Sequence, residues 1–315
     1  MAIINVVANV IVPVFGVLGV GYAVAWREWF NVDATRGLAF YTMRVAIPAM
    51  LFRAMSITDL PAYFPYRFVA CYFLAAGFMF LLGTLLSRRL FYLPPAERAL
   101  FAFGCSYSNL VLVGIPLVLT AWGDDAVLPL FTIVAFNTVI LFTPLTMMLE
   151  ADRHHRLPLI KQIGAALLGL IRNQYITSIL AGLAVNLLGL PWPVALESIL
   201  KMIAASATPC ALFCMGATLA RQRIAGEIRA ASLISLVKLI LFPASVWLLG
   251  HYLLGIDNDW LVVAVTIAAM PTGINIYLFA EQYQKGIALA TTTTVLSTLF
   301  AVATVTVALT LLGAG

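Results

Sequence analysis

Long runs of apolar residues, separated by short polar segments, follow one another along the whole chain. Each run is close to the roughly 20 residues that a helix needs to cross about 30 Å of hydrocarbon. Because the bilayer core offers no water to an unpaired backbone group, runs of this length predict helices. The pattern therefore predicts an all-α polytopic membrane protein with ten transmembrane helices. The expected spans are residues 2–26, 34–53, 66–87, 98–121, 125–149, 174–190, 194–220, 229–254, 259–283 and 286–312.

Composition supports this interpretation and argues against several classes of function. Of the 315 residues, 63% are hydrophobic and 10% are charged, whereas a soluble domain carries roughly a quarter charged residues. The four cysteines lie in apolar segments, so we expect no disulfide framework, no metal site and no cofactor. A placed nucleophile, paired carboxylates and an H-E-x-x-H motif are missing, which argues against an intramembrane enzyme. The net charge of +5 is distributed in loops, so we expect no nucleic-acid partner.

The basic residues predict an orientation in the lipid bilayer. Lysine and arginine concentrate on alternate connections, with thirteen on one side of the predicted membrane and only Arg53, Arg67 and Lys201 on the other. By the positive-inside rule, the side with thirteen is cytoplasmic. Both termini are then expected on the non-cytoplasmic side of the inner membrane. The apolar stretch 157–172 is expected to form an interfacial helix within a cytoplasmic linker, residues 150–173.

Ten spans divide into two units of five, and the two units share a motif. The second span contains AIPAMLF around Pro48, and the seventh contains ATPCALF around Pro209. An odd number of spans per unit places the two copies in opposite orientations. We therefore expect inverted repeats at residues 1–149 and 174–315, of the kind that builds secondary transporters around a site where the repeats meet. Pro48 and Pro209 are secondary candidates for that site.

Two spans carry helix-breaking residues at corresponding places in the two halves. The fourth contains SYSNLVLVGIPL (106–117), and the ninth contains AAMPTGINIYLFAEQY (268–283). Proline removes a backbone donor and crowds the carbonyl one turn earlier, and broken backbone persists in a membrane only against protein or a water-filled cavity. Matching breaks in both halves therefore indicate a transport site. The candidate site residues are Asn109, Gly114, Pro116, Pro271 and Asn275, with Ser108 and Thr272 as weaker candidates.

The two asparagines admit more than one role. Asn109 and Asn275 each offer a hydrogen-bond donor and an acceptor, so they can bind a substrate carboxylate or cap the broken backbone. Both roles together are the leading interpretation. A simpler alternative is a pair of proline kinks whose backbone groups are satisfied by neighbouring helices.

Two cations, and no acidic residue, fall near the centres of the predicted spans. Arg44 lies about midway through the second span, and Lys238 lies about nine residues into the eighth. An ionisable group at this depth is costly and indicates function, so Arg44 is a candidate substrate-binding residue and Lys238 a secondary candidate. Because a cation exchanger needs a buried carboxylate, buried cations near positive half-helix N-termini favour an anionic substrate. Arg44 can instead snorkel or bond carbonyls near Pro48, and Lys238 can lie in a scaffold or supply only a positive potential.

Three stretches resemble signature segments of the auxin efflux carrier family of membrane transporters. They are SNLVLVGIPL (108–117), PCALFCMGATLA (209–220) and MPTGINIYLFAEQY (270–283), and the likeness covers essentially the whole chain in order and spacing. The resemblance implies a ten-helix fold like that of bile-acid and sodium/proton transporters. In that fold, broken helices cross in a transport domain beside a scaffold domain, and each domain is assembled from both repeats. The resemblance also implies a homodimer formed through the scaffold.

Carried over by position, the resemblance assigns Asn109, Gly114 and Pro116 to the first crossover and Pro271 and Asn275 to the second. The family includes plant auxin exporters and bacterial carriers of malonate, malate and similar acids. Plant members often have a long hydrophilic loop between the halves, and the corresponding loop is short here. The chain therefore resembles a bacterial member.

The leading hypothesis is a secondary transporter of small organic anions, such as dicarboxylates or auxin-like acids. It is expected to work by alternating access, with the site at the crossover of the fourth and ninth helices. The alternative is a sodium- or proton-coupled symporter of the same fold that carries a different small solute. Dependence of transport on the ion separates symport from uniport.

Overall fold

The computed structural model of the chain describes residues 2–60, 65–152, 174–189, 193–224 and 226–314. Within these ranges all regular secondary structure is helical, and the one β-type contact is an isolated bridge between Ser108 and Thr272. The all-α prediction is therefore confirmed. The expected interfacial helix at 157–172 lies outside the described residues.

Among the residues that the structure describes, seven continuous helical stretches are long and apolar enough to cross a membrane, judged by length and composition. Two shorter apolar helices, Gln174–Leu187 and Asn258–Ala268, accompany them. These helices support a multi-pass membrane protein, while the count of ten spans stays a prediction. The seven stretches are Ile4–Trp26, Val32–Ile57, Tyr66–Leu90, Leu110–Glu150, Val194–Leu219, Ile228–Leu254 and Ile287–Leu312.

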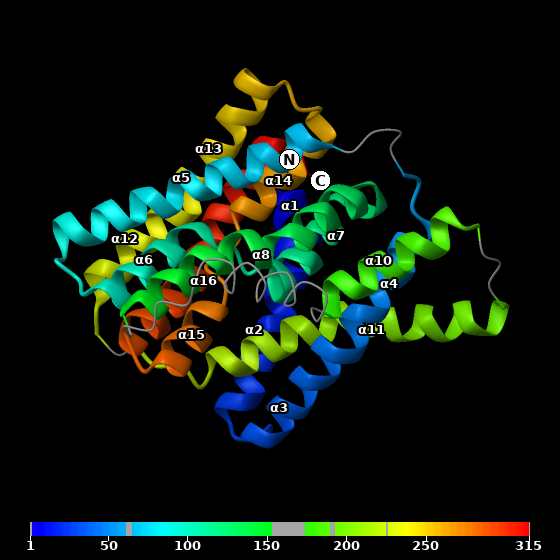
Figure 1. The fold of residues 1–315 in the computed structure, drawn as a ribbon. Helices are drawn as coiled ribbons and strands as arrows, with labels where there is room; N and C mark the ends of the chain where they lie inside the picture. Colours follow the sequence, from blue (N-terminus) through cyan, green and yellow to red (C-terminus); the bar gives the residue numbers. More distant parts are fainter. Residues whose placement is uncertain (1, 61–64, 153–173, 190–192, 225, 315) are drawn as a thin grey trace.

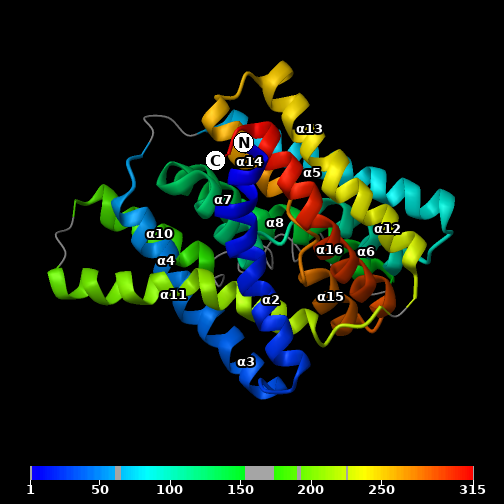
Figure 2. The same ribbon diagram turned by 180° about the vertical axis from the view of Figure 1, so that it is seen from behind.

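One set of helices packs around α2 and α11, and we name it the α2–α11 group. In this group α2 packs along α11, α10 packs along α4, and α11 also contacts α3 and α4. In Figure 1, α4, α10 and α11 lie on the right and α3 at the bottom, while α1 and α2 run through the centre; Figure 2 shows the group from behind. Its elements are α1 (Ala2–Val6), η1 (Val7–Ile11), α2 (Val12–Trp26), α3 (Val32–Tyr41), η2 (Thr42–Ala46), α4 (Ile47–Ile57), α10 (Gln174–Leu187) and α11 (Val194–Leu219).

The remaining helices form a second set, the α6–α14 group, which contains both predicted breaks. Here α5 packs on α6, α12 on α16, α13 on α14, and α6 on α8. The elements are α5 (Tyr66–Leu90), α6 (Pro95–Ser106), η3 (Leu110–Gly114), α7 (Ile115–Trp122), η4 (Gly123–Ala126), α8 (Val127–Asp152), α12 (Ile228–Leu236), η5 (Val237–Leu241), α13 (Phe242–Leu248), η6 (Leu249–Leu254), α14 (Asn258–Ala268), α15 (Asn275–Tyr283) and α16 (Ile287–Leu312).

Four prolines each follow a π-helical turn. Proline lacks the backbone N–H, and its ring crowds the carbonyl four residues earlier. The helix widens for one turn before the proline, as in η3 before Pro116 and η5 before Pro243. Such widened turns are frequent at functional sites. Arg44 lies in the turn before Pro48, and Lys238 lies in the turn before Pro243.

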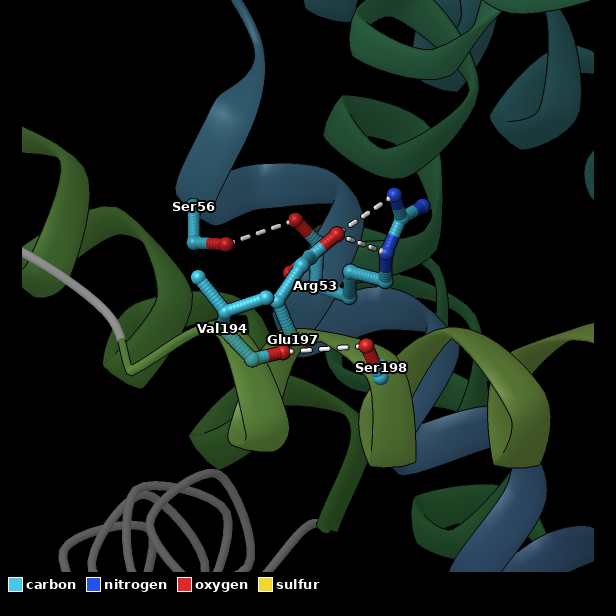
Figure 3. Close-up of polar contacts among 5 residues, drawn as sticks. All are labelled: Arg53, Ser56, Val194, Glu197 and Ser198. Atoms are coloured by element: carbon cyan, nitrogen blue, oxygen red, sulfur yellow. Dashed lines mark hydrogen bonds and ion pairs between the residues drawn. The ribbon is translucent and has the colours of Figure 1, made fainter.

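An ion pair joins two helices of the α2–α11 group that are far apart in sequence (Figure 3). Arg53 of α4 donates from Nε to Oε1 of Glu197 on α11 at 2.8 Å, and one of its terminal nitrogens lies 2.7 Å from the same oxygen. The two side chains are 26% and 33% exposed. A pair with this much exposure contributes about 0–1 kcal/mol, so its role is to fix how α4 and α11 meet rather than to hold them together.

Both ends of the chain lie at the same end of the molecule, where the marks for the two termini stand side by side in Figures 1 and 2. The N-terminal helix α1 contacts α16 there. A chain whose ends lie on one side crosses a membrane an even number of times.

Close packing of α2 on α11 depends on glycine at the points of contact. A Cβ atom added to Gly216 would overlap the carbonyl of Leu18, and one added to Gly21 would overlap the carbonyl of Phe213. Small residues of this kind let backbones approach in membranes, where lipid gives no hydrophobic drive between helices. The α2–α11 contact therefore has no room for a larger residue at either glycine.

We expect Gly216→Ala to lower the melting temperature of the detergent-purified protein. The added methyl group meets backbone atoms that cannot swing away, and overpacking of this kind costs about 1–3 kcal/mol of unfolding free energy. Gly19→Ala is the matched control, because a Cβ at Gly19 has nothing within 4 Å. Equal melting temperatures for the two variants would contradict the packing described for α2 and α11.

Candidate functional site

Two helices of the α6–α14 group are interrupted, and the interruptions face each other. The helix α6 ends at Ser106, the next three residues (107–109) are not helical, and helix resumes at Leu110. The helix α14 ends at Ala268, and helix resumes in α15 at Asn275. Both breaks fall inside the stretches in which the sequence predicts them.

The two interruptions pair with each other through backbone hydrogen bonds. Ser108 and Thr272 form an antiparallel bridge. On one side of it, the N–H of Asn109 donates to the carbonyl of Pro271 at 2.8 Å. On the other side, the N–H of Gly273 donates to the carbonyl of Tyr107 at 3.1 Å. Each break therefore satisfies backbone groups that the other leaves free, as a membrane interior requires.

The side chains at the bridge repeat this exchange. The hydroxyl of Ser108 donates to the carbonyl of Ile267 at 2.8 Å, and the hydroxyl of Thr272 donates to the carbonyl of Gly104 at 3.0 Å. Ile267 lies in the last turn of α14 and Gly104 in the last turn of α6. Each hydroxyl thus caps the C-terminal end of the opposite helix, whose last carbonyls have no partner within their own helix.

The two predicted asparagines lie beside the bridge and reach in different directions. The Nδ2 of Asn275 donates to the hydroxyl of Tyr107 at 2.8 Å. The Nδ2 of Asn109 points to the sulfur of Met215 on α11, at 3.3 Å. Asn109 is 4% exposed. Because a thioether is a weak acceptor, the Asn109 amide keeps most of its capacity to bond a polar ligand.

A cavity of about 180 Å³ opens beside the two breaks, between the two helix groups. Residues from the first turn of η3 and from the start of α15 line it, so it lies at the N-terminal ends of both resumed helices. N-terminal helix ends carry partial positive charge and favour anions. The polar and aromatic residues that line the cavity are Tyr107, Asn109, Asn137, Phe142, Tyr175 and Asn275.

Aromatic rings form one wall next to this cavity. The ring of Tyr107 stacks on Phe103 with 4.5 Å between centroids, and it meets Phe142 at 5.3 Å. Phe142 in turn contacts the edge of Phe279 at 5.1 Å. The wall gives the cavity an apolar surface beside the amides, a combination typical of small-molecule sites.

The glycines and prolines of the breaks shape the backbone and do not reach into the cavity. A Cβ at Gly273 would collide with the ring of Tyr107, so only glycine allows the bridge to form this close to that ring. Gly114 ends η3 and donates its N–H to the carbonyl of Asn109 at 2.9 Å. Pro116 is buried near the start of α7, and Pro271 accepts the bridge bond from Asn109.

The other predicted residues lie away from this cavity. Arg44 is exposed in η2, where its positive charge interacts with Tyr175. Pro48 and Pro209 lie in α4 and α11, and neither lines the cavity. Lys238 is buried in η5 with backbone partners. The structure thus brings together Asn109, Asn275, Ser108 and Thr272, and neither cation lines the cavity beside them.

Asn137 lines the cavity and was not among the residues predicted from sequence. It is 3% exposed on α8 and its side chain interacts with that of Tyr107, while its Oδ1 makes no hydrogen bond of ordinary geometry among the described residues. A buried polar atom without a partner is costly and calls for an explanation such as a ligand. The signal in the sequence was a single asparagine in the middle of the apolar run 125–149.

The groups around the cavity are suited to a polar ligand. Amide and hydroxyl groups line it, and within the described part of the chain no group of three His, Cys, Asp or Glu side chains converges anywhere. No aspartate or glutamate lines the cavity. Neutral donors at two helix N-termini are suited to hold a carboxylate.

Comparison with known proteins covers nearly the whole chain. A family model described as Membrane transport protein matches residues 6–309. The chain is also similar to a protein of Rhizobium meliloti (strain 1021) named "Putative malonate transporter", with 30% identity over 98% of this chain and 97% of that protein. Both matches include the two breaks and the helices around them.

We expect Thr272→Val to lower the melting temperature in detergent. Valine keeps the shape of the side chain but leaves the buried carbonyl of Gly104 without this donor, which costs about 1–3 kcal/mol. The matched control is Thr306→Val, because the hydroxyl of Thr306 bonds only the carbonyl of Val302 in its own helix. If Thr272→Val and Thr306→Val have the same melting temperature, the hydrogen bond from Thr272 to Gly104 is not what stabilises the paired breaks.

Proposed function

Since the chain belongs to the auxin efflux carrier family of membrane transport proteins, we propose that it carries small organic anions across the membrane by alternating access. The proposed substrates are carboxylates such as dicarboxylates or auxin-like acids. The observation that carries this proposal is the cavity beside the paired breaks. It combines two helix N-termini, three asparagine amides and no acidic side chain.

The proposed contacts follow from the lining of the cavity. A substrate carboxylate accepts hydrogen bonds from the amides of Asn109 and Asn275, and the N-terminal ends of η3 and α15 stabilise its charge. The unpaired Oδ1 of Asn137 suits a hydrogen-bond donor on the substrate, such as a carboxyl proton or a hydroxyl. The aromatic wall contacts the carbon skeleton. A cavity of about 180 Å³ favours small acids.

We further propose that the chain consists of two inverted repeats. The bonds between the two breaks support this idea, because the hydroxyl of Ser108 in the first break caps the last turn of α14, and the hydroxyl of Thr272 in the second caps the last turn of α6. A reciprocal pattern of this kind is what a two-fold axis through the bridge produces. Ten spans, five in each repeat, with both termini on the non-cytoplasmic side, agree with termini that lie at one end of the molecule.

In the proposed mechanism the α6–α14 group is the moving transport domain and the α2–α11 group is the scaffold, which in this proposal also forms a homodimer. The cavity supports the division, because Asn109 and Asn275 come from the first group, whereas Met43 and Tyr175 come from the second. Movement of one group against the other changes the side on which the cavity opens and leaves the bridge intact. This is the rocking motion expected of transporters built from repeats.

The substrate class is tested by melting the detergent-purified protein with malonate, malate or indole-3-acetate and with organic cations of matched size. A ligand that binds only the folded protein stabilises it by RT ln(1 + [L]/Kd). We expect one or more carboxylates to raise the melting temperature in a saturable way. Stabilisation by the cations alone would contradict an anion site.

We expect Asn109→Asp to weaken binding of a stabilising carboxylate at least tenfold. The change keeps the side-chain shape but places a second negative charge beside the bound anion, and two such charges about 4 Å apart repel by roughly 1–4 kcal/mol at effective dielectric constants of 80 to 20. The measurement is the Kd from thermal-shift titration. Asn258→Asp, exposed at the start of α14, is the control and should bind as the unmodified protein does. An unchanged Kd for Asn109→Asp would remove Asn109 from the site.

A further inference from the structure

Lys238 is a cation enclosed within the α6–α14 group. It is 0% exposed, at the π-helical turn η5, and it makes no ion pair with any residue that the structure describes. An unpaired charge in a membrane protein interior is costly and is retained where it has a task. The cavity at the breaks does not include this residue.

The amino group of Lys238 is held at the break of α14. Its Nζ donates to the carbonyl of Ala268 at 2.5 Å and to the carbonyl of Met270 at 2.8 Å. The third side of the ammonium faces the ring of Phe242, 4.8 Å from the centroid, where a cation–π contact is favourable. All three directions in which an ammonium donates are therefore occupied.

The two carbonyls are those that the interruption of α14 sets free. Ala268 is the last residue of α14, and Met270 lies in the bend that follows it, just before the stretch that pairs with the other break. Unwound carbonyls at the C-terminal end of a half-helix are the ligands with which transporters of this architecture hold a sodium ion or a proton carrier. At this break the ligands hold a side-chain ammonium.

The first break has no such cation. The carbonyl of Gly104 at the end of α6 accepts from the neutral hydroxyl of Thr272, and the hydroxyl of Ser106 bonds back to Ala102 and Phe103. Tyr72 approaches Ser108 there with its hydroxyl, at 3.3 Å. Among the described residues, one break is thus capped by neutral groups and the other by a positive charge.

We propose that Lys238 is a tethered cation, which fills the place where a cation-coupled carrier would bind a free ion. The charge is part of the chain, so it stays at the break of α14 throughout the transport cycle. Its positive potential favours an anion at the neighbouring cavity. This electrical consequence rests on the proposed anion transport, but occupancy of the carbonyl site by the ammonium is tested without any substrate.

The first experiment restores the missing cation with a soluble one. Lys238→Ala removes the ammonium and leaves a space, and its melting temperature in detergent is measured with increasing propylammonium chloride. We expect the variant to melt below the unmodified protein and to regain most of the loss in a saturable way, because a ligand bound only by the folded state stabilises it. Lys285→Ala, which removes an exposed lysine, is the matched control and should not respond.

Neutral n-propanol separates charge from volume in the same titration. It fills a similar space without a positive charge, so we expect it to restore little of the melting temperature. Equal recovery with propanol, or no recovery with propylammonium, would overturn the proposal. Neither outcome depends on which acid the protein carries, so failure here is distinct from failure of the carboxylate panel on the unmodified protein.

A second variant covers the case in which Lys238→Ala does not fold. Lys238→Met keeps approximately the length of the side chain and removes the charge, so we expect it to fold and to melt below the unmodified protein. Because its side chain fills the space, we expect propylammonium to leave its melting temperature unchanged. We also expect the unmodified protein to melt at the same temperature in sodium and in choline chloride. A Lys238→Met protein as stable as the original, or a saturable stabilisation of the original by sodium, would contradict a tethered cation.

Discussion

The fold depends on one constraint, which is that broken backbone inside a bilayer must find partners. Two helices are interrupted in this protein, and each provides partners for the other through the bridge between Ser108 and Thr272. Two side-chain hydroxyls complete the exchange by capping the opposite helix ends. Because neither break can persist without the other, the two interrupted helices act as one unit. The cavity proposed for the substrate lies beside that unit, so the paired breaks determine part of its shape.

The same constraint explains the position of the two cations. Arg44 and Lys238 both lie in π-helical turns that precede a proline, yet their surroundings differ completely. Lys238 points inward and satisfies two carbonyls of the interrupted helix α14. Arg44 is exposed on the α2–α11 group and has no place in the cavity. In the proposed mechanism, positive charge is built into the group that binds the anion, and no acidic side chain lines the cavity.

Part of this arrangement could be predicted from sequence because it depends on local chemistry. Proline, glycine and asparagine close together in a long apolar run indicate an interrupted helix, and Asn109 and Asn275 line the cavity as that pattern predicts. The role of Ser108 and Thr272 as caps was less evident, since it arises only when two breaks 164 positions apart meet. The carbonyls that Lys238 binds could likewise not be predicted, because they lie at the end of another helix, α14. Asn137 was missed because a single polar residue in an apolar span has many possible partners.

The central claim is that the two breaks together form one anion site, and a double-mutant cycle tests it most directly. The Kd for malonate, or for another carboxylate that stabilises the protein, is measured for the unmodified protein, for Asn109→Ala, for Asn275→Ala and for the double variant. If both amides contact the same anion, the two losses are not additive, and the coupling energy is about 0.5 kcal/mol or more. Affinities in both single variants equal to that of the unmodified protein would contradict the claim and move the site away from the paired breaks.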